Sequence, residues 1–129
     1  MEIQPPRKKR TNPEEKIQSR IRFNLECQGW VVEKMHGNKY QSGIPDLYCF
    51  HPEYGHRWVE IKTKTGRLTH AQFAKFTKWE SKGLEVFVLI SHEEIPLLLD
   101  KDKAVSWKRF AHKVSKPKRD FIMGDDVRR

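Results

Sequence analysis

The segment from Glu85 to Ile90 is a nearly continuous apolar run, with five hydrophobic residues after the glutamate. A strand with one solvated face alternates apolar and polar residues, whereas a strand covered on both faces is apolar throughout. The run therefore predicts a sheet strand that helices cover on both sides. We expect an α/β sandwich around a mixed β-sheet.

The rest of the pattern predicts the order helix, three strands, helix and strand, followed by short helices. Asn12-Pro13 reads as an N-cap and first helical residue, and an apolar stripe with a spacing of four follows at Ile17, Ile21 and Leu25 up to Gly29. We expect strands over 30–32, 46–50 and 57–62, the last two forming a hairpin. A second helix begins with a Thr69–Gln72 capping box, carries Phe73, Phe76 and Trp79, and ends at Gly83. Ser91 is expected to cap a short helix that runs to residue 99, and a last helix is expected over 107–114.

Composition points to a polyanionic partner. The 129 residues carry a net charge of +9, which favours nucleic acid, and they suit one small domain with tails. We expect a basic disordered arm over 1–12, one domain over 13–100 and a loose or partly helical extension over 101–129. A solubilising tail is the other interpretation of the arm.

Several classes of protein are disfavoured. The chain has no apolar run of membrane-span length and no signal-peptide pattern. We therefore expect an intracellular protein, cytoplasmic or nucleoid-associated, and in the host cytoplasm if it is phage-encoded. Cys27 and Cys49 form no CxxC pair and are expected to be reduced and buried. The sequence contains no Walker A motif, so we expect no nucleotide cofactor.

Acidic and basic residues stand close together on two of the expected strands. Asp46 follows Pro45, while Glu60 and Lys62 are two residues apart and so share one strand face. Two carboxylates beside a lysine can hold Mg²⁺ and position an attacking water. Each residue also has a simpler interpretation, because Asp46 fits a turn and the other two fit a solvated strand face.

The combined pattern resembles the VRR-NUC group of the PD-(D/E)xK nuclease superfamily. The elements that carry the resemblance run from Glu14 to about Ser91 and comprise the leading helix, Gly43-Ile44-Pro45-Asp46-Leu47, Glu60-Ile61-Lys62-Thr63, Gly66-Arg67-Leu68-Thr69 with Gln72, and Gly83. The arrangement is also similar in outline to archaeal Holliday-junction resolvases. The resemblance implies a restriction-endonuclease-like α/β sandwich of order αβββαβ plus a C-terminal helix.

The resemblance also implies roles for single residues. Asp46 and Glu60 would be metal ligands together with the backbone carbonyl of Ile61, and Lys62 would be the catalytic lysine. Glu14 matches the acid of the leading helix, with Glu15 as second choice, and Gln72 matches a glutamine near the site. Glu14 could instead complement the helix dipole, and Gln72 could serve the capping box alone.

Basic residues flank these motifs and are candidates for DNA contact. The expected contacts are Lys39, Lys64, Arg67 and Lys75, with Lys34 and Lys78 as further candidates, and Gly43 as a point where the DNA backbone approaches closely. Trp58 and Tyr40 are possible stacking groups, although packing explains Trp58 at least as well.

The sequence thus predicts a Mg²⁺-dependent DNA endonuclease, with Mn²⁺ expected to substitute. The preferred substrate is branched DNA, a Holliday junction or a flap, cut by a homodimer that presents two sites. One alternative is a non-catalytic DNA-binding module with a nuclease-like fold. The other is RNA binding or cleavage, which no RNP-type motif supports.

Overall fold

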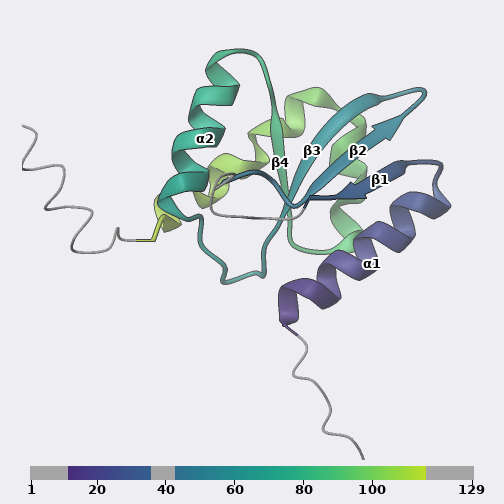
Figure 1. Cartoon of the computed structure of the whole chain (residues 1–129), viewed down its shortest axis with the longest axis horizontal. Coiled ribbons are helices and arrows are strands. Elements are labelled where there is room, and N and C mark those ends of the chain that lie inside the picture. Colours follow the sequence, from purple (N-terminus) through teal and green to yellow (C-terminus); the bar gives the residue numbers. More distant parts are fainter. Residues whose placement is uncertain (1–11, 36–42, 116–129) are drawn as a thin grey trace, which may run out of the picture.

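The computed structural model describes residues 12–35 and 43–115, with the backbone alone for 101–106. The elements are α1 (Pro13–Cys27), β1 (Val31–Lys34), β2 (Leu47–His51), β3 (Gly55–Ile61), α2 (His70–Ser81), β4 (Val86–Leu89) and the 3₁₀ helices η1 (His92–Leu99) and η2 (Lys101–Lys113) (Figure 1). No helix in this described part of the chain has the length and apolar character of a membrane span.

The four strands form one mixed sheet in the order β1-β2-β3-β4. β1, β2 and β3 pair antiparallel, and β4 joins β3 in parallel after the crossover through α2. Tyr48, Trp58 and Val86 lie in register across β2, β3 and β4. The predicted hairpin and the mixed sheet are confirmed.

Helices cover both faces of β4, as its apolar sequence predicts. Phe87 and Leu89 belong to one core cluster, which also contains Ile21 and Leu25 of α1 and parts of η1. Val86 and Val88 belong to a second cluster, packed against α2 and η2. The α/β sandwich is therefore confirmed, with α1 and η1 on one face of β4 and α2 and η2 on the other.

The cap residues set the ends of the two α-helices. The Asn12 side chain accepts a hydrogen bond from the Glu14 backbone N–H at 2.9 Å, which satisfies a free donor of the first turn. Gly29 follows α1 and Gly83 follows α2, both with positive φ, so each supplies the left-handed backbone that ends a helix. These boundaries agree with the sequence expectation.

Other local expectations need correction. Ser91 precedes η1, but its side chain makes no capping hydrogen bond. The last helix is a 3₁₀ helix that begins at Lys101 rather than at Trp107. Cys27 is exposed on the outer side of α1, whereas Cys49 is buried on β2, where burial raises the pKa of the thiol to about 12. Both cysteines are free.

The segment beyond residue 100 contributes to the core. Trp107 and Phe110 are 4% and 3% exposed and pack in the second cluster with Phe76 of α2. The Trp107 indole N–H also donates to Glu80 Oε2 at 2.8 Å, which satisfies its polar atom. This segment thus closes the β4 end of the sandwich.

Trp107→Ala should destabilise the fold because it removes a buried ring and its hydrogen bond. We expect the free energy of unfolding in urea to fall by about 3–5 kcal/mol. Phe23→Ala is the matched control, since Phe23 is 67% exposed and its loss should change stability by about 0.5 kcal/mol or less. Equal effects of the two substitutions would contradict a core role for Trp107.

Candidate active site

Asp46 and Glu60 meet because β2 begins where the antiparallel β3 ends. Asp46 directly precedes β2, and its Oδ2 accepts a hydrogen bond from the Ile61 backbone N–H at 2.8 Å. The preceding Pro45 is buried and fixes the backbone leading into the strand. Lys62 N–H donates to Leu89 O on β4, so the N–H and C=O of Ile61 point to the opposite edge, toward Asp46.

Glu60 and Lys62 point to the same side of β3, as the strand period predicts, but this side is buried. Glu60 is 2% exposed and Lys62 is 6% exposed. The Lys62 Nζ lies 3.6 Å from Glu60 Oε2. The interpretation as a solvated strand face is therefore wrong, and the two residues form a buried ion pair beside Asp46.

Gln72 serves both of the roles that the sequence left open. Its Oε1 accepts from the Thr69 N–H and its own N–H donates to Thr69 Oγ1, each at 3.0 Å, which completes the capping box. Its Nε2 donates to Glu60 Oε2 at 2.8 Å. The first turn of α2 therefore fixes the orientation of the Glu60 carboxylate.

Burial dominates the electrostatics of the two acids. Burial and the neighbouring Asp46 charge raise the pKa of Glu60 to about 8, although Lys62 and the Gln72 hydrogen bond act in the opposite direction. Burial also raises the pKa of Asp46, against the Ile61 N–H bond and the Lys62 charge. The two carboxylates thus lack sufficient positive charge to be stable as anions together.

One oxygen of Glu60 marks where a cation would bind. Oε2 accepts from Gln72, whereas Oε1 is buried and has no hydrogen-bond partner. A buried oxygen without a partner is costly, and oxygen ligands are those that Mg²⁺ prefers. The donor set of Asp46, Glu60 and the Ile61 carbonyl therefore fits the expected Mg²⁺. Among the described residues, no group of three His, Cys, Asp or Glu side chains forms a metal cluster.

Glu14 lies in the first turn of α1, close enough for its charge to affect Glu60. Its charge is one of the causes that raise the pKa of Glu60. Glu15 is exposed and is not among these causes. Of the two acids that the sequence offered, Glu14 is the one that this electrostatic coupling connects to the site.

Gly43 is required by the packing of α2 against the loop before β2. Its φ is +85°, and a Cβ added there would lie 2.7 Å from the Ala71 carbonyl oxygen and 3.2 Å from the Gln72 nitrogen. Only glycine fits such a close approach without a shift of the backbone. The structure thus explains Gly43 by helix docking, and the expected DNA contact at this residue stays a prediction.

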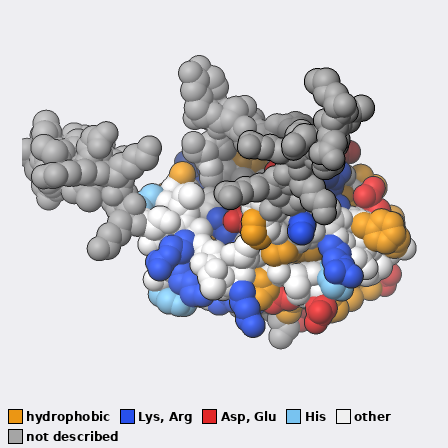
Figure 2. Space-filling model, turned by 90° about the horizontal axis from the view of Figure 1, so that it is seen from below, with side chains coloured by type: hydrophobic (Ala, Val, Ile, Leu, Met, Phe, Trp, Pro, Cys, Tyr) orange, Lys and Arg blue, Asp and Glu red, His pale blue; other side chains and the backbone are white. Residues whose placement is uncertain are grey.

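The candidate DNA-contacting residues lie on exposed segments around the site. Lys64 and Arg67 are exposed on the loop between β3 and α2, and Lys75 is half-buried on α2 with its Nζ 6.0 Å from the Trp79 ring centroid. The Lys34 charge lowers the pKa of Asp46, which connects β1 to the site. Lys39 and Tyr40 lie outside the described residues. Figure 2 shows Lys and Arg side chains spread over one face of the molecule.

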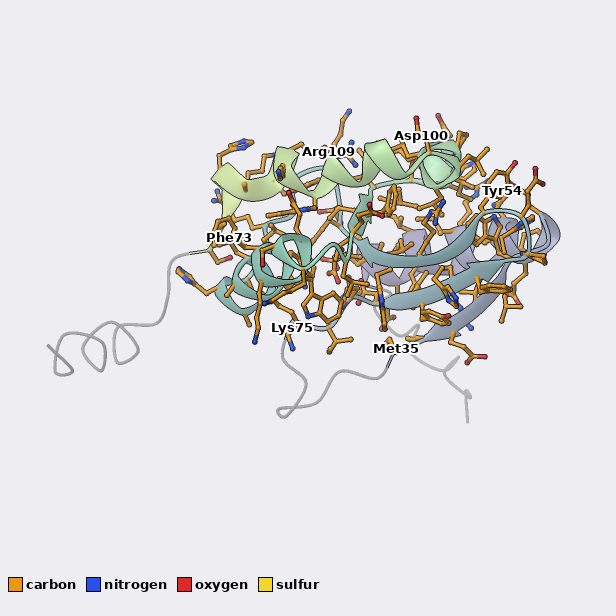
Figure 3. The ribbon with its side chains drawn as sticks, turned by 90° about the horizontal axis from the view of Figure 1, so that it is seen from above. Met35, Tyr54, Phe73, Lys75, Asp100 and Arg109 are labelled. Carbon is orange, nitrogen blue, oxygen red and sulfur yellow. The ribbon has the colours of Figure 1, made fainter. Side chains whose placement is uncertain are left out.

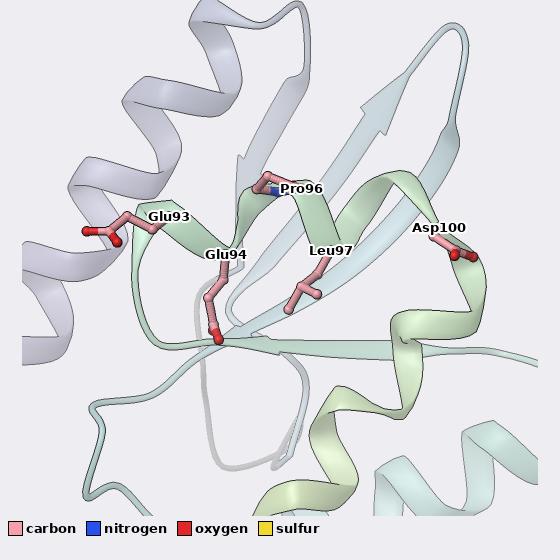
Figure 4. Close-up of a pocket in the computed structure, with 5 residues that line it drawn as sticks. All are labelled: Glu93, Glu94, Pro96, Leu97 and Asp100. Atoms are coloured by element: carbon pink, nitrogen blue, oxygen red, sulfur yellow. The ribbon is translucent and has the colours of Figure 1, made fainter.

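A hollow of about 370 Å³ lies elsewhere, on η1. It is lined by Glu93, Glu94, Pro96, Leu97 and Asp100, none of which is a candidate site residue (Figure 4). Arg109 donates to both oxygens of Glu94 at 2.7 Å. Burial would raise the pKa of Glu94, but these bonds, the Ile90 N–H and the Arg109 charge lower it overall. This hollow is therefore separate from the paired acids.

Comparison with known proteins agrees with this geometry. The family model described as "VRR-NUC domain" matches residues 12–93, which span the helix, the hairpin, both motif strands and α2. A solved structure titled "VRR_NUC domain" superposes with a TM-score of 0.60 at 24% identity, over 69% of this chain and 96% of that one. Among curated proteins, none matches the sequence.

Gly43→Ala should displace the first turn of α2. We expect the variant to lose about 1–3 kcal/mol more unfolding free energy than Gly83→Ala. Gly83 is the matched control because its φ is also positive, +87°, while nothing lies within 4 Å of an added Cβ. Urea denaturation measures both values. If the two variants lose the same stability, backbone strain alone explains Gly43 and the docking role is wrong.

The metal-free protein should lose stability as the pH rises. Between pH 4.5 and about 8, folded Glu60 keeps a proton that the unfolded chain releases, so the folded state binds more protons. The free energy of unfolding should fall by up to about 1.4 kcal/mol per pH unit in this window. Glu60→Gln should remove most of this slope, measured by urea denaturation in EDTA at several pH values. An unchanged slope in the variant would show that other groups cause it.

Proposed function

Because the chain belongs to the VRR-NUC family of nuclease domains, we propose that it is a Mg²⁺-dependent endonuclease that hydrolyses phosphodiester bonds in DNA. The observation that carries the proposal is the partnerless buried Glu60 Oε1 beside Asp46 and Lys62. A buried pair of acids that lacks compensating charge suits a divalent cation, and a structural ion pair gives no reason for the free oxygen.

Asp46, Glu60 and the Ile61 carbonyl would hold the ion, with Mn²⁺ able to substitute. When bound, such an ion supplies positive charge to the reacting phosphate and makes a water molecule more acidic. Asp46 Oδ2 accepts a hydrogen bond from the Ile61 N–H, and Glu60 Oε2 accepts one from Gln72 Nε2. Both carboxylates are therefore oriented before substrate binds. This fixed orientation lowers the reorganisation that the reaction requires.

Lys62 is proposed to position the attacking water and to stabilise charge on the phosphate. Its ammonium is held beside Glu60 at 3.6 Å and is almost fully buried, so its charge acts in a region of weak solvent screening. Water then attacks phosphorus in one step and loses a proton to solvent, while the bond to the leaving oxygen breaks and that oxygen takes up a proton. Gln72 and Glu14 are proposed to act through Glu60, the first by its hydrogen bond and the second by its charge.

The proposed substrate is branched DNA, and the proposed assembly is a homodimer. A net charge of +9 favours a polyanion, and the exposed Lys64 and Arg67 beside the site suit phosphate contacts. Two sites in a symmetric dimer would allow two strands of a junction to be cut. Sedimentation of the protein with and without a four-way junction tests the assembly.

Lys62→Met should abolish most cleavage while DNA binding persists. The substitution keeps the buried volume and removes the charge, so we expect the cleavage rate to fall by about 100- to 1,000-fold. The measurement follows labelled junction, flap, duplex and single-stranded DNA with Mg²⁺, Mn²⁺ or EDTA. Lys82→Met is the control, because Lys82 is an exposed lysine at the end of α2.

The same assay can overturn the enzyme proposal. If the wild type binds DNA tightly without metal and cuts none of the four substrates, the chain is a non-catalytic DNA-binding module. If Lys62→Met cuts at the wild-type rate in Mg²⁺, the nuclease site is not the one described. Labelled RNA added to the assay tests the remaining alternative, and preferential cutting of RNA would replace DNA as the substrate.

A further inference from the structure

Five aromatic side chains form a continuous strip across the sheet and onto α2. We define the aromatic strip as Phe50, His56, Tyr48, Trp58 and Trp79. Ring centroids of successive members lie 4.8 Å, 5.6 Å, 5.3 Å and 5.5 Å apart, and the Tyr48 hydroxyl is hydrogen-bonded to His56 Nδ1. Adjacent rings are tilted by 33° to 59°, so they do not cover one another by face-to-face stacking.

The strip lies on a part of the sheet that the helices leave open. Tyr48, Phe50 and His56 belong to neither core cluster, while Trp58 and Trp79 pack only at the margin of the second. His56 is exposed and the other four side chains are half-buried. In Figure 3, Met35 and Lys75 lie on the side of the molecule opposite Arg109 and Asp100. Among the described residues, α2 and η2 pack on the strip's face at Val86 and Val88 of β4, and only Trp58 and Trp79 of the strip reach that cluster.

The strip begins directly beside the paired acids. Trp58 precedes Glu60 by two residues on β3, and Tyr48 follows Asp46 by two residues at the start of β2. Residues two apart on a strand point to the same side and are separated by about 7 Å. Trp58 and Tyr48 therefore lie about one nucleotide step along the strands from the two acids, and Phe50 and His56 lie about twice as far.

Charge around the strip differs between its two sides. On the α2 side, the Lys75 Nζ lies 6.0 Å from the Trp79 ring centroid, and Lys78 is exposed on the same helix. On the β1 side, the exposed Glu33 lies in register with Tyr48. Glu33 and Lys34 alternate along β1, and Glu33 is the one in register with the strip. On the strip's face a phosphate backbone is thus attracted along α2 and repelled beside Tyr48, which leaves the rings between them for bases.

We propose that the aromatic strip binds unpaired nucleotides of the DNA strand next to the phosphate that is cut. The inference rests on the proposed nuclease function and names its substrate class: DNA with a single-stranded segment adjoining the site. Bases stack on tilted, half-exposed rings irrespective of sequence, and each stacked base contributes about 1–3 kcal/mol. Bases within a duplex are stacked on each other and do not present these faces.

Cross-strand packing is the simpler explanation of the strip. Aromatic pairs on neighbouring strands stabilise a sheet without any ligand. The two explanations differ in whether removing the bases, with the phosphates retained, changes DNA affinity. The decisive comparison therefore changes the DNA and leaves the protein intact.

The first experiment measures binding of two tailed duplexes to the wild-type protein in EDTA. One duplex carries a thymidine tail, and the other carries an abasic tail with the same number of phosphates. Stacking predicts that the thymidine tail binds about 5- to 150-fold more tightly for each base stacked on the strip. Equal affinities overturn the proposal, because phosphate contacts alone would then explain binding.

The second experiment assigns the stacking to the strip. Tyr48→Leu and Trp58→Leu should each lose most of the thymidine-tail advantage and should bind a blunt duplex within about two-fold of the wild type. Phe23→Leu, on the exposed side of α1, should retain the advantage. If both folded strip variants keep the advantage, or lose blunt-duplex affinity equally, the proposal is wrong.

These outcomes are independent of cleavage. Binding in EDTA does not require the metal or Lys62, so a protein that never cuts DNA can still show or lack the thymidine-tail advantage. Failure of the nuclease proposal is read from the cleavage assay, and failure of the strip proposal is read from the two tails.

Discussion

The hydrogen bond from the Ile61 N–H to Asp46 Oδ2 joins the end of β3 to the start of β2, and the site depends on it. It brings one carboxylate against the strand that carries the other. Both acids then lie in a poorly solvated region, where burial and the Asp46 charge raise the pKa of Glu60 to about 8 and so disfavour its ionised form. Folding thus brings two carboxyl groups together, where β2 and β3 meet, with too little positive charge nearby to balance both as anions.

Lys62 supplies part of the missing positive charge but does not balance both carboxylates. Its ammonium is 3.6 Å from Glu60 Oε2, and its charge lowers the pKa of Glu60, yet burial and Asp46 outweigh it. A lysine that fully neutralised Glu60 would leave no need for a further cation and would have little remaining field for a phosphate. Under the proposed function, this incomplete compensation suits the pair to a divalent ion, for which Glu60 Oε1 is available because only Oε2 is bonded to Gln72.

Much of the fold and the main site residues follow from local sequence rules. The two-residue period of β3 placed Glu60 and Lys62 together, and the Thr69–Gln72 spacing identified the head of α2. The burial of this strand face could not be predicted from its own residues, because α2 and η2 cover it from elsewhere in the chain. For the same reason, the sequence indicates only a loop glycine at Gly43, because its close contact with the Ala71 backbone depends on where α2 packs.

The position of the aromatic strip also restricts how DNA can approach. Glu60 and Trp58 lie on the same side of β3, so under the strip proposal a strand whose phosphate reaches the acids passes its neighbouring nucleotides over β2 and β3. A continuous duplex keeps its bases stacked inside and meets this face with its backbone alone. A strand that leaves its partner at a branch point can place a phosphate at the acids and bases on the rings together. Under the two proposals, selectivity for branched DNA therefore arises from the distance between the acids and the rings, and it requires no recognition of base sequence.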